Sequence, residues 1–310
     1  MTARFEEVRL NLPHVEVAAH LYGPEDGRPV IALHGWLDNA ATFSRLAPRL
    51  DGLRILALDL PGHGHSGHRP VGASYALWDY AYDVLQTAEQ FGWSRFSLLG
   101  HSMGAIVSVM LAGALPERIE RMVLIDGVVP YTGEAEQAPE KLGAALEAQL
   151  RVQSKRKPVY ATPDQAVAAR MKGVGAVSRE AAERLAERGL MPVPGGYTWR
   201  TDTRLTLPSP LRLTQAHALA FARRVACPTL LVLAEQGLMV QPERQAMLAG
   251  LPYDIRRLPG GHHLHLDDEQ GARAVAEIAQ PFLTDRGALQ DSVENRLDEA
   301  AATGERGRTR

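Results

Sequence analysis

A serine between two glycines is the residue of this chain best placed to act as a nucleophile. Ser102 lies in the sequence GHSMG, residues 100–104. The apolar run 96–99 before it is typical of a buried strand, and the run 105–115 after it is typical of a helix. A G-x-S-x-G sequence between a strand and a helix forms a sharp turn that presents the serine hydroxyl at the positive end of the helix. An ordinary turn that contains serine is the alternative, but the further motifs below favour a nucleophile that attacks a carbonyl carbon.

A group of histidines late in the chain offers a general base for this serine. His262, His263 and His265 lie in LPGGHHLHLDD, between the last predicted strand and the last predicted helix. We predict His262, which follows Gly261, as the base, with His263 as the second candidate and His265 in a packing or hydrogen-bonding role. A metal site is the alternative, but no carboxylate or cysteine set accompanies the histidines at a familiar ligand spacing. We therefore predict no metal.

The end of an early strand offers backbone donors for an oxyanion. His34-Gly35-Trp36 follows the apolar run 30–33. Gly35 allows the backbone to approach a ligand closely, so the amide of Trp36 can point at a developing negative charge. The amide of Met103, the residue after the nucleophile, is the expected second donor. A simple turn at the end of a strand is the alternative interpretation.

The composition excludes several classes of protein. Among the 310 residues, 34 Lys and Arg nearly balance 36 Asp and Glu, which argues against a nucleic-acid partner. The single Cys227 excludes an intrachain disulfide and is typical of a reducing compartment. The first ten residues are charged where a signal peptide is apolar, and no apolar run is long enough for a membrane span. We expect a cytoplasmic protein without a membrane partner, and no pattern indicates its oligomeric state.

The hydrophobic pattern predicts an α/β protein. Alternating residues over 5–22 predict an antiparallel hairpin, and six further buried strands alternate with helices. This order predicts a mostly parallel eight-stranded sheet with helices on both faces. The further strands are expected at 30–33, 54–59, 96–99, 121–126, 229–234 and 253–258, and the helices at 41–50, 74–92, 105–115, from 242, and at 267–283.

The strand pattern stops between residues 127 and 210. This stretch holds predicted helices at 140–155, 163–171 and 178–188 but no buried strand, and we predict a helical cap inserted after the sixth strand. Its cations Arg151, Lys155, Arg156 and Lys157 are interpreted as a solvated helix face. The core is then 1–126 and 211–284. Residues 285–310 are charged and poor in large apolar residues, which predicts a disordered tail.

Four motifs in this order resemble the α/β-hydrolase superfamily: HGW (34–36), DLPGHGHS (59–66), GHSMG (100–104) and GGHH (260–263). More narrowly, HGWLDNAATF (34–43), GGYTWRTDTRL (195–205) and GGHHLHL (260–266) are similar to the serine hydrolase-like proteins, and the resemblance covers about residues 8–283. It implies a cap between the sixth and seventh strands of the sheet, no cofactor, and hydrolysis through an acyl-enzyme. It does not imply a particular substrate.

The chain departs from the superfamily pattern at the acid of the catalytic triad. That acid usually follows the seventh strand, where this chain has Gly237. Some relatives carry the acid after the sixth strand, and Asp126 matches that position, so it is the leading candidate. Glu235 is the second candidate, and the absence of any supporting carboxylate is the third possibility. Asp59 and Asp38 are interpreted as structural, the first ending a strand and the second capping a helix.

Together these features predict an esterase-like serine hydrolase that acts on a small carboxylic ester or a related acyl substrate. Ser102 would attack the carbonyl carbon, His262 would take its proton, and Asp126 would hold the imidazole. Thioester hydrolysis and C–C bond hydrolysis by the same residues are alternatives. A degenerate hydrolase fold that only binds a ligand is another, favoured by Gly237 and opposed by the intact serine and histidine.

Overall fold

The computed structural model describes residues 5–173 and 175–285. Their centre is an eight-stranded sheet in the order β1-β2-β4-β3-β5-β6-β9-β10. The pairs β1–β2 and β2–β4 are antiparallel and all others are parallel, so the predicted mostly parallel sheet is confirmed. The strands are β1 (Glu6–Asn11), β2 (Glu16–Tyr22), β3 (Arg28–Leu33), β4 (Leu53–Leu58), β5 (Phe96–His101), β6 (Ile119–Ile125), β9 (Thr229–Gln236) and β10 (Asp254–Gly261).

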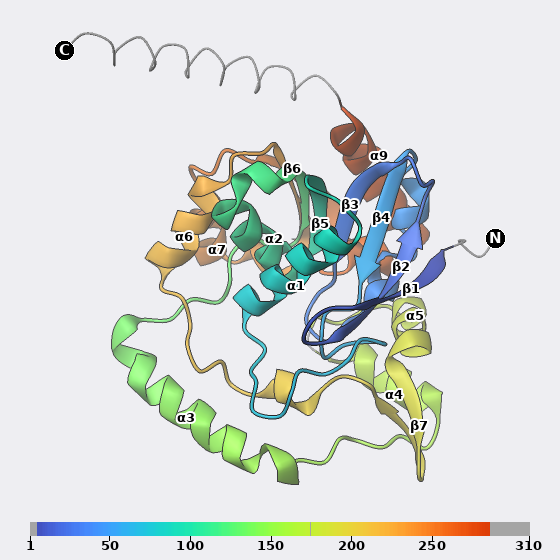
Figure 1. The fold of residues 1–310 in the computed structure, drawn as a ribbon, viewed down its shortest axis with the longest axis vertical. Coiled ribbons are helices and arrows are strands. Elements are labelled where there is room, and N and C mark those ends of the chain that lie inside the picture. Colours follow the sequence, from blue (N-terminus) through green and yellow to red (C-terminus); the bar gives the residue numbers. More distant parts are fainter. Residues whose placement is uncertain (1–4, 174, 286–310) are drawn as a thin grey trace.

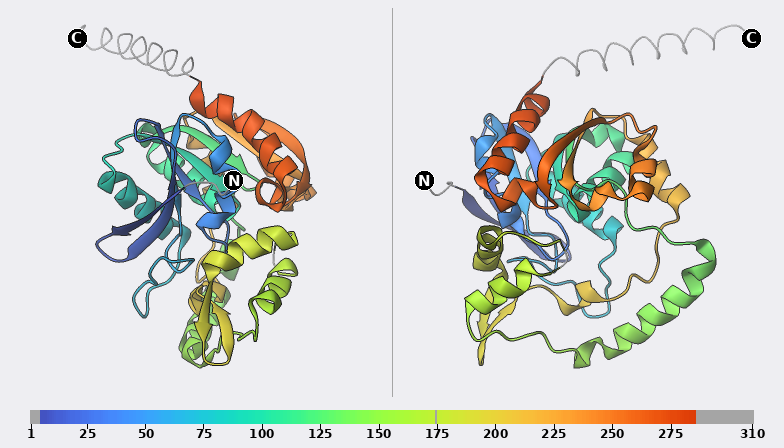
Figure 2. Two further views of the ribbon diagram at one scale, coloured as in Figure 1. Left: turned by 90° about the vertical axis from the view of Figure 1, so that its right-hand side faces the viewer. Right: turned by 180° about the vertical axis from the view of Figure 1, so that it is seen from behind.

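Helices cover both faces of this sheet, because its central strands are apolar on both sides. In β3, Ile31 and Leu33 face one layer of helices while Val30 and Ala32 face the other. The first layer holds α1 (Leu77–Gln90), α2 (Met103–Ala114) and α6 (Gln215–Arg224), and the second holds the 3-10 helix η1 (Ala40–Phe43) and α9 (Glu269–Thr284). Figures 1 and 2 show the two layers on either side of the strands. A short helix α7 (Pro242–Leu248) connects β9 to β10.

One predicted helix is absent from the structure, and one short helix was not predicted. Residues 41–50 do not form one helix but two short 3-10 helices, η1 and η2 (Ala47–Arg49), because Pro48 lacks the amide that a continuous helix requires. The predicted closing helix at 267–283 corresponds to α9, and a short helix that was not predicted, α8 (Leu264–Asp267), precedes it. The side chain of Asp268 separates them, since it caps α9 by accepting a hydrogen bond from the amide of Gly271 at 2.7 Å.

Residues 127–210, which the sequence assigns to the cap, are called the cap segment below. They form α3 (Ala138–Arg151), α4 (Pro163–Met171), α5 (Arg179–Gly189) and a hairpin of β7 (Leu190–Val193) and β8 (Gly196–Trp199). The hairpin was not predicted, because its strands are four residues long and largely unburied and so lack an apolar run. The segment lies beyond one end of the strands, with α3 standing away from the other elements (Figures 1 and 2).

Two further expectations concern the ends of the chain and the membrane. The predicted tail lies outside the described residues except for Asp285, whose backbone oxygen accepts a hydrogen bond from Arg121 at 3.0 Å. Among the described helices, none is both long and apolar enough to cross a bilayer.

A buried ion pair fastens the cap segment to the sheet. Arg188 of α5 is 6% exposed, and its Nε donates to Oδ2 of Asp59 at 2.8 Å. Its two terminal nitrogens donate to the carboxylate of Glu7 at 2.8 and 2.9 Å. Asp59 follows β4 and is fully buried; its carboxylate also accepts from the amide of Ala40 at 2.7 Å. The carboxylate at the end of β4 therefore depends on a cation from the cap segment.

We expect Arg188→Met to lower the free energy of unfolding by about 3–5 kcal/mol, because it leaves the buried Asp59 carboxylate without its counter-charge. The measurement is urea unfolding followed by circular dichroism. Arg179→Met is the matched control on the same helix: Arg179 is 53% exposed, its ion pairs with Asp164 and Glu183 lie at the surface, and their loss should lower the free energy of unfolding far less. Equal losses for the two variants would contradict the structural role of Arg188.

Candidate active site

Ser102 lies in a strained turn between β5 and α2. Its backbone has φ 52° and ψ −114°, a conformation that non-glycine residues rarely adopt. A Cβ atom on Gly104 would overlap the carbonyl of Leu33 on β3, and one on Gly100 would overlap the backbone of Ala105. Both glycines of the motif are thus required by close packing around the turn, and this packing holds the serine in its strained conformation.

The structure brings together three of the predicted site residues. The Oγ of Ser102 lies 2.9 Å from Nε2 of His262, and Nδ1 of His262 lies 2.6 Å from Oδ2 of Asp126. Ser102 lies in the turn after β5, His262 follows β10, and Asp126 follows β6. These strand ends meet at the carboxyl edge of the sheet. Since Nδ1 faces a carboxylate, it carries the proton and donates it, and Nε2 is left to accept from the serine hydroxyl. Their catalytic roles stay a prediction.

Gly237 and Asp126 are complementary. Asp126 has φ 46°, and its Oδ2 also accepts a hydrogen bond from the amide of Leu238 at 2.8 Å. A Cβ atom on Gly237 would overlap this carboxylate. The glycine at the usual position of the acid therefore leaves space for an acid from the neighbouring strand. Glu235, the second candidate, is exposed and makes no contact with His262.

The loop after β3 is held by a buried, neutral histidine. His34 is fully buried, and burial lowers its pKa to about 4. Its Nδ1 donates to the carbonyl of Gly35 at 2.7 Å, and its Nε2 accepts from the amide of Leu60 at 3.0 Å. The indole of Trp36 donates to the carbonyl of Leu205 in the cap segment at 3.0 Å. The loop is thus fixed from both sides, and the amides of Trp36 and Met103 stay the predicted oxyanion donors.

A second group of charged residues lies behind His262. Oδ2 of Asp38 lies 2.9 Å from Nε2 of His263, and Arg170 of α4 donates to Oδ1 of Asp38 at 2.7 Å. The interpretation of Asp38 as a helix cap is wrong, since Asn39 caps η1 through its side chain. Burial alone would raise the pKa of Asp38, but the charges of His263 and Arg170 hold it well below its usual range. His263 therefore already has a carboxylate partner other than Asp126.

This group has the donor set of a metal site but not its electrostatics. One ligand atom each of Asp38, His101 and His263 lies within 4.8 Å of the others, so a carboxylate from a distant segment does accompany the histidines, contrary to the sequence interpretation. The guanidinium of Arg170 lies against the same carboxylate and would repel a bound metal cation. His101 also has another partner, since its Nε2 donates to the backbone carbonyl of His262 at 3.0 Å.

The cap segment touches His262 directly. Arg170 donates through Nη1 to the carbonyl of Gly175 at 3.0 Å, and a Cβ atom on Gly175 would lie 3.0 Å from Cδ2 of His262. The ion pair between Arg170 and Asp38 therefore seats this cap loop on the predicted base. Neither residue could be singled out from the sequence. Arg170 lies on a predicted helix and Gly175 in the loop after it, and neither belongs to a distinctive motif.

Comparison with known proteins identifies the family. The profile of the α/β hydrolase fold matches residues 28–269. The chain is also 31% identical over 297 residues to a serine hydrolase-like protein of Danio rerio, covering 92% of this chain and 91% of that protein. This chain belongs to the α/β-hydrolase family.

Other similar proteins agree with this assignment. A probable serine hydrolase of Drosophila melanogaster is 32% identical over 276 residues, covering 84% of this α/β hydrolase and 83% of the relative. The crystal structure of a hypothetical protein from Pseudomonas aeruginosa is 72% identical, with a TM-score of 0.89, and covers 90% of this chain and 100% of the other. The resemblance to the superfamily and to its serine hydrolase-like members is thus confirmed.

The pairing of Asp126 with Gly237 leads to a test by exchange in this α/β hydrolase. Asp126→Asn should lower kcat about 10⁴-fold, because the amide favours the wrong imidazole tautomer. The exchange Asp126→Gly with Gly237→Asp should recover part of the activity lost in Asp126→Gly alone, because a glycine tolerates φ 46° and leaves room for the new carboxylate. The measurement is turnover of 4-nitrophenyl acetate.

The control for this exchange is Gly237→Asp alone, which should unfold at lower urea because its side chain overlaps the Asp126 carboxylate. Near wild-type turnover of Asp126→Asn would contradict the prediction.

Buried histidines make this fold sensitive to acid. Burial lowers the pKa of His34 and His20 to about 4, and that of His63 and His265 to about 3. Below pH ~6.5 the unfolded chain binds protons that the folded chain does not. The free energy of unfolding therefore decreases as the pH is lowered, until the pH reaches the pKa of these histidines in the folded chain. Each such histidine contributes about 1.4 kcal/mol per pH unit in that window. Stability should therefore drop steeply between pH 6.5 and 4.

His265 allows this linkage to be tested one residue at a time. It is fully buried, and neither ring nitrogen has a hydrogen-bond partner among the described residues. His265→Leu should therefore fold and reduce the pH dependence of the unfolding free energy by about 1.4 kcal/mol per pH unit between pH 6 and 5. Urea unfolding at both pH values measures this slope, and an unchanged slope would show that His265 is not neutral in the folded protein.

Proposed function

We propose that this chain is a serine hydrolase that cleaves small carboxylic esters through an acyl-enzyme. The observation that carries this proposal is the continuous hydrogen-bonded chain from Ser102 through His262 to Asp126, with distances of 2.9 and 2.6 Å. Such an arrangement places a nucleophile, a general base and an orienting acid in the relation that acyl transfer requires. The names of the curated relatives support the same class of reaction.

The proposed reaction begins when Oγ of Ser102 attacks the ester carbonyl carbon and its proton passes to Nε2 of His262. Asp126 stabilises the imidazolium and keeps its Nδ1–H directed away from the serine. The tetrahedral oxyanion accepts hydrogen bonds from the amides of Trp36 and Met103, a stabilisation worth roughly 2.7–4 kcal/mol for one such donor. His262 then protonates the leaving alkoxide, and a water activated by the same histidine hydrolyses the acyl-enzyme.

The alternative of a ligand-binding fold without activity loses its main support. It depended on Gly237 as a missing acid, but Asp126 fills that space and contacts His262. The carboxylate is also 2% exposed and held by the amide of Leu238, so the imidazole has a fixed and dry partner. These contacts favour an active enzyme.

The test of this function is labelling by a fluorophosphonate together with ester turnover. The wild-type protein should be labelled at Ser102, and Ser102→Ala and His262→Ala should each lose several orders of magnitude in kcat, because nucleophile and base act as a unit. Ser154→Ala is the control, since Ser154 is an exposed serine of the cap segment. The proposal fails if Ser102→Ala is still labelled and active, and the base is misassigned if only His263→Ala abolishes turnover.

A further inference from the structure

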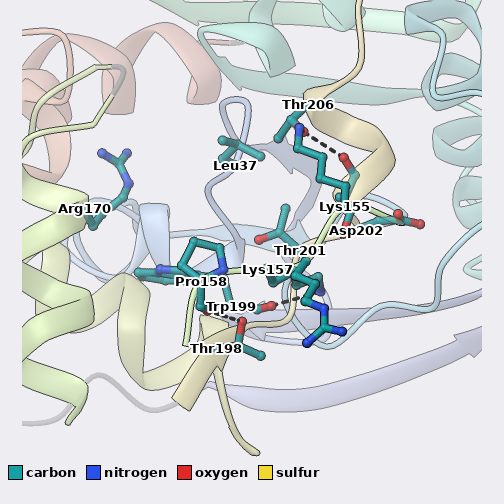
Figure 3. A pocket seen from close by; sticks show the side chains of 12 residues that line it. Leu37, Lys155, Lys157, Pro158, Arg170, Thr198, Trp199, Thr201, Asp202 and Thr206 are labelled. Carbon is teal, nitrogen blue, oxygen red and sulfur yellow. Dashed lines mark hydrogen bonds between the residues drawn. The ribbon is translucent and has the colours of Figure 1, made fainter. Parts of the chain in front are cut away.

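A cavity of about 290 Å³ lies between the cap segment and the loop that follows β3 (Figure 3). Its walls come from residues 155–158, 198–199, 201–203 and 206, together with Leu37 and Arg170. Leu37 directly follows Trp36, the predicted oxyanion donor, and Arg170 holds the loop that lies on His262. Neither Ser102 nor His262 lines the cavity. The cavity is therefore distinct from the proposed catalytic residues, but two segments of its lining connect with them: the loop that carries Leu37 and the predicted oxyanion donor, and helix α4, whose Arg170 holds Gly175.

Positive charge dominates the lining of this cavity. Lys155, Arg156, Lys157 and Arg170 line it, against the single acid Asp202. Arg170 is paired with Asp38, but the other three form no ion pair with a carboxylate of the described residues. Lys155 donates to the hydroxyl of Thr206 at 2.7 Å, and Lys157 to the carbonyl of Trp199 at 3.1 Å (Figure 3). These acceptors are neutral, so neither hydrogen bond supplies a counter-charge to its ammonium group.

The acid in the lining is already neutralised by another residue. Oδ2 of Asp202 lies 2.7 Å from Nη2 of Arg204, which is 13% exposed, and it accepts from the hydroxyl of Tyr75 at 2.7 Å. Burial lowers the pKa of the half-buried Lys157, and Asp202 offsets this only in part. A bound anion would restore the balance of charge in the cavity.

The sequence interpretation of these cations as a solvated helix face is correct for Arg151, which is 69% exposed on α3. It is wrong about the helix for residues 155–157, of which Lys155 and Arg156 are exposed and Lys157 is half-buried. Helix α3 ends at Arg151, and residues 155–158 follow a short 3-10 turn as irregular chain ending in Pro158. This path brings the cations beside the apolar groups of Leu37 and Trp199 in the cavity wall. Figure 3 shows Lys155 next to Thr206 on one side of the cavity and Pro158 beside Trp199 on the other. Apolar walls beside these cations match a ligand that has a short apolar body and an anionic end.

We propose that this cavity binds an anionic group, a carboxylate or a phosphate, carried by the ester that is cleaved at Ser102. Lys155, Arg156 and Lys157 bind the anion, and Leu37 and Trp199 contact the apolar chain that joins it to the ester. This inference rests on the proposed function. Charge-assisted hydrogen bonds to a carboxylate or phosphate are about twice as strong as neutral ones, so the anion should decide which esters are good substrates.

The experiment compares matched esters that differ in charge. The probes are mono-4-nitrophenyl glutarate, which carries a carboxylate, its neutral methyl ester of the same chain length, and 4-nitrophenyl 4-phosphonobutanoate. We expect kcat/KM of an anionic ester to exceed that of the neutral ester about tenfold or more. A larger ratio for the phosphonate than for the carboxylate, or the reverse, identifies the preferred anion.

Variants assign the preference to the cavity. In Lys155→Gln combined with Lys157→Gln, the ratio of anionic to neutral kcat/KM should fall towards one. Arg151→Gln is the matched control: it removes one positive charge from the same segment, but Arg151 lies on α3, is 69% exposed and does not line the cavity. Its ratio should equal that of the wild type. A preference that falls equally in both variants would be a long-range effect of net charge and would overturn the inference.

Failure of this inference and failure of the proposed function give different results. A wild-type ratio near one, with hydrolysis of the neutral ester that depends on Ser102, overturns the anion site and leaves the hydrolase proposal standing. If no ester is cleaved and no fluorophosphonate label appears, the hydrolase proposal fails, and calorimetry with monomethyl glutarate tests the cavity alone. Binding that is lost in the double lysine variant would support the anion site, and no binding at millimolar concentration would overturn it.

Discussion

The contact between Asp126 and His262 is the constraint on which the geometry of the site depends. A carboxylate at the end of β6 can reach a histidine after β10 only if the strand between them leaves room, and Gly237 provides this room after β9. The positive φ of Asp126 turns its side chain toward that space, where the amide of Leu238 fixes it. The strained turn at Ser102 is on the adjacent strand β5. The positions of the nucleophile and the acid are thus determined by the neighbouring strands β5 and β6, and His262 forms a hydrogen bond with each of them.

The buried Arg188 and the partly buried Arg170 fix part of the cap segment against the sheet and its loops. Arg188 of α5 pairs with Asp59 after β4, and Arg170 of α4 pairs with Asp38 in the loop after β3. Removing either cation would leave a buried carboxylate unpaired, which costs several kcal/mol. Asp38 also contacts His263. Helix α4 is therefore joined by charge to the loop that carries the predicted oxyanion donor Trp36 and, through Asp38, to the neighbour of the predicted base, while α5 is joined to the end of β4.

The local features of this protein could be predicted from sequence. Of the long-range contacts in the site, only that of Asp126 with His262 could be, through the resemblance to relatives that carry the acid after the sixth strand. The elbow, the sheet and His262 follow from patterns within a few residues: glycine spacing, apolar runs and position after a strand. The pairing of Asp38 with His263 joins residues 225 positions apart, and ion pairs have no sequence period. Gly237 is a second example. In the sequence it indicates only that the usual acid is missing after the seventh strand. The packed structure shows that the absent side chain leaves space for the carboxylate of Asp126 from the neighbouring strand.

The choice of one base among several histidines follows from their partners and not from their distance to the serine. The rings of His101 and His263 lie 4.7 and 5.0 Å from that of His262, yet His101 donates to a backbone carbonyl and His263 faces the carboxylate that Arg170 already pairs. His262 has a carboxylate at one nitrogen and the serine hydroxyl at the other. The proposed mechanism requires this imidazole to become positive during turnover, which charged neighbours would oppose. Burial holds the pKa of His101 well below its usual range and that of His265 near 3, so both stay neutral near neutral pH. Neither His101 nor His265 therefore adds a positive charge beside His262 when its imidazole becomes charged.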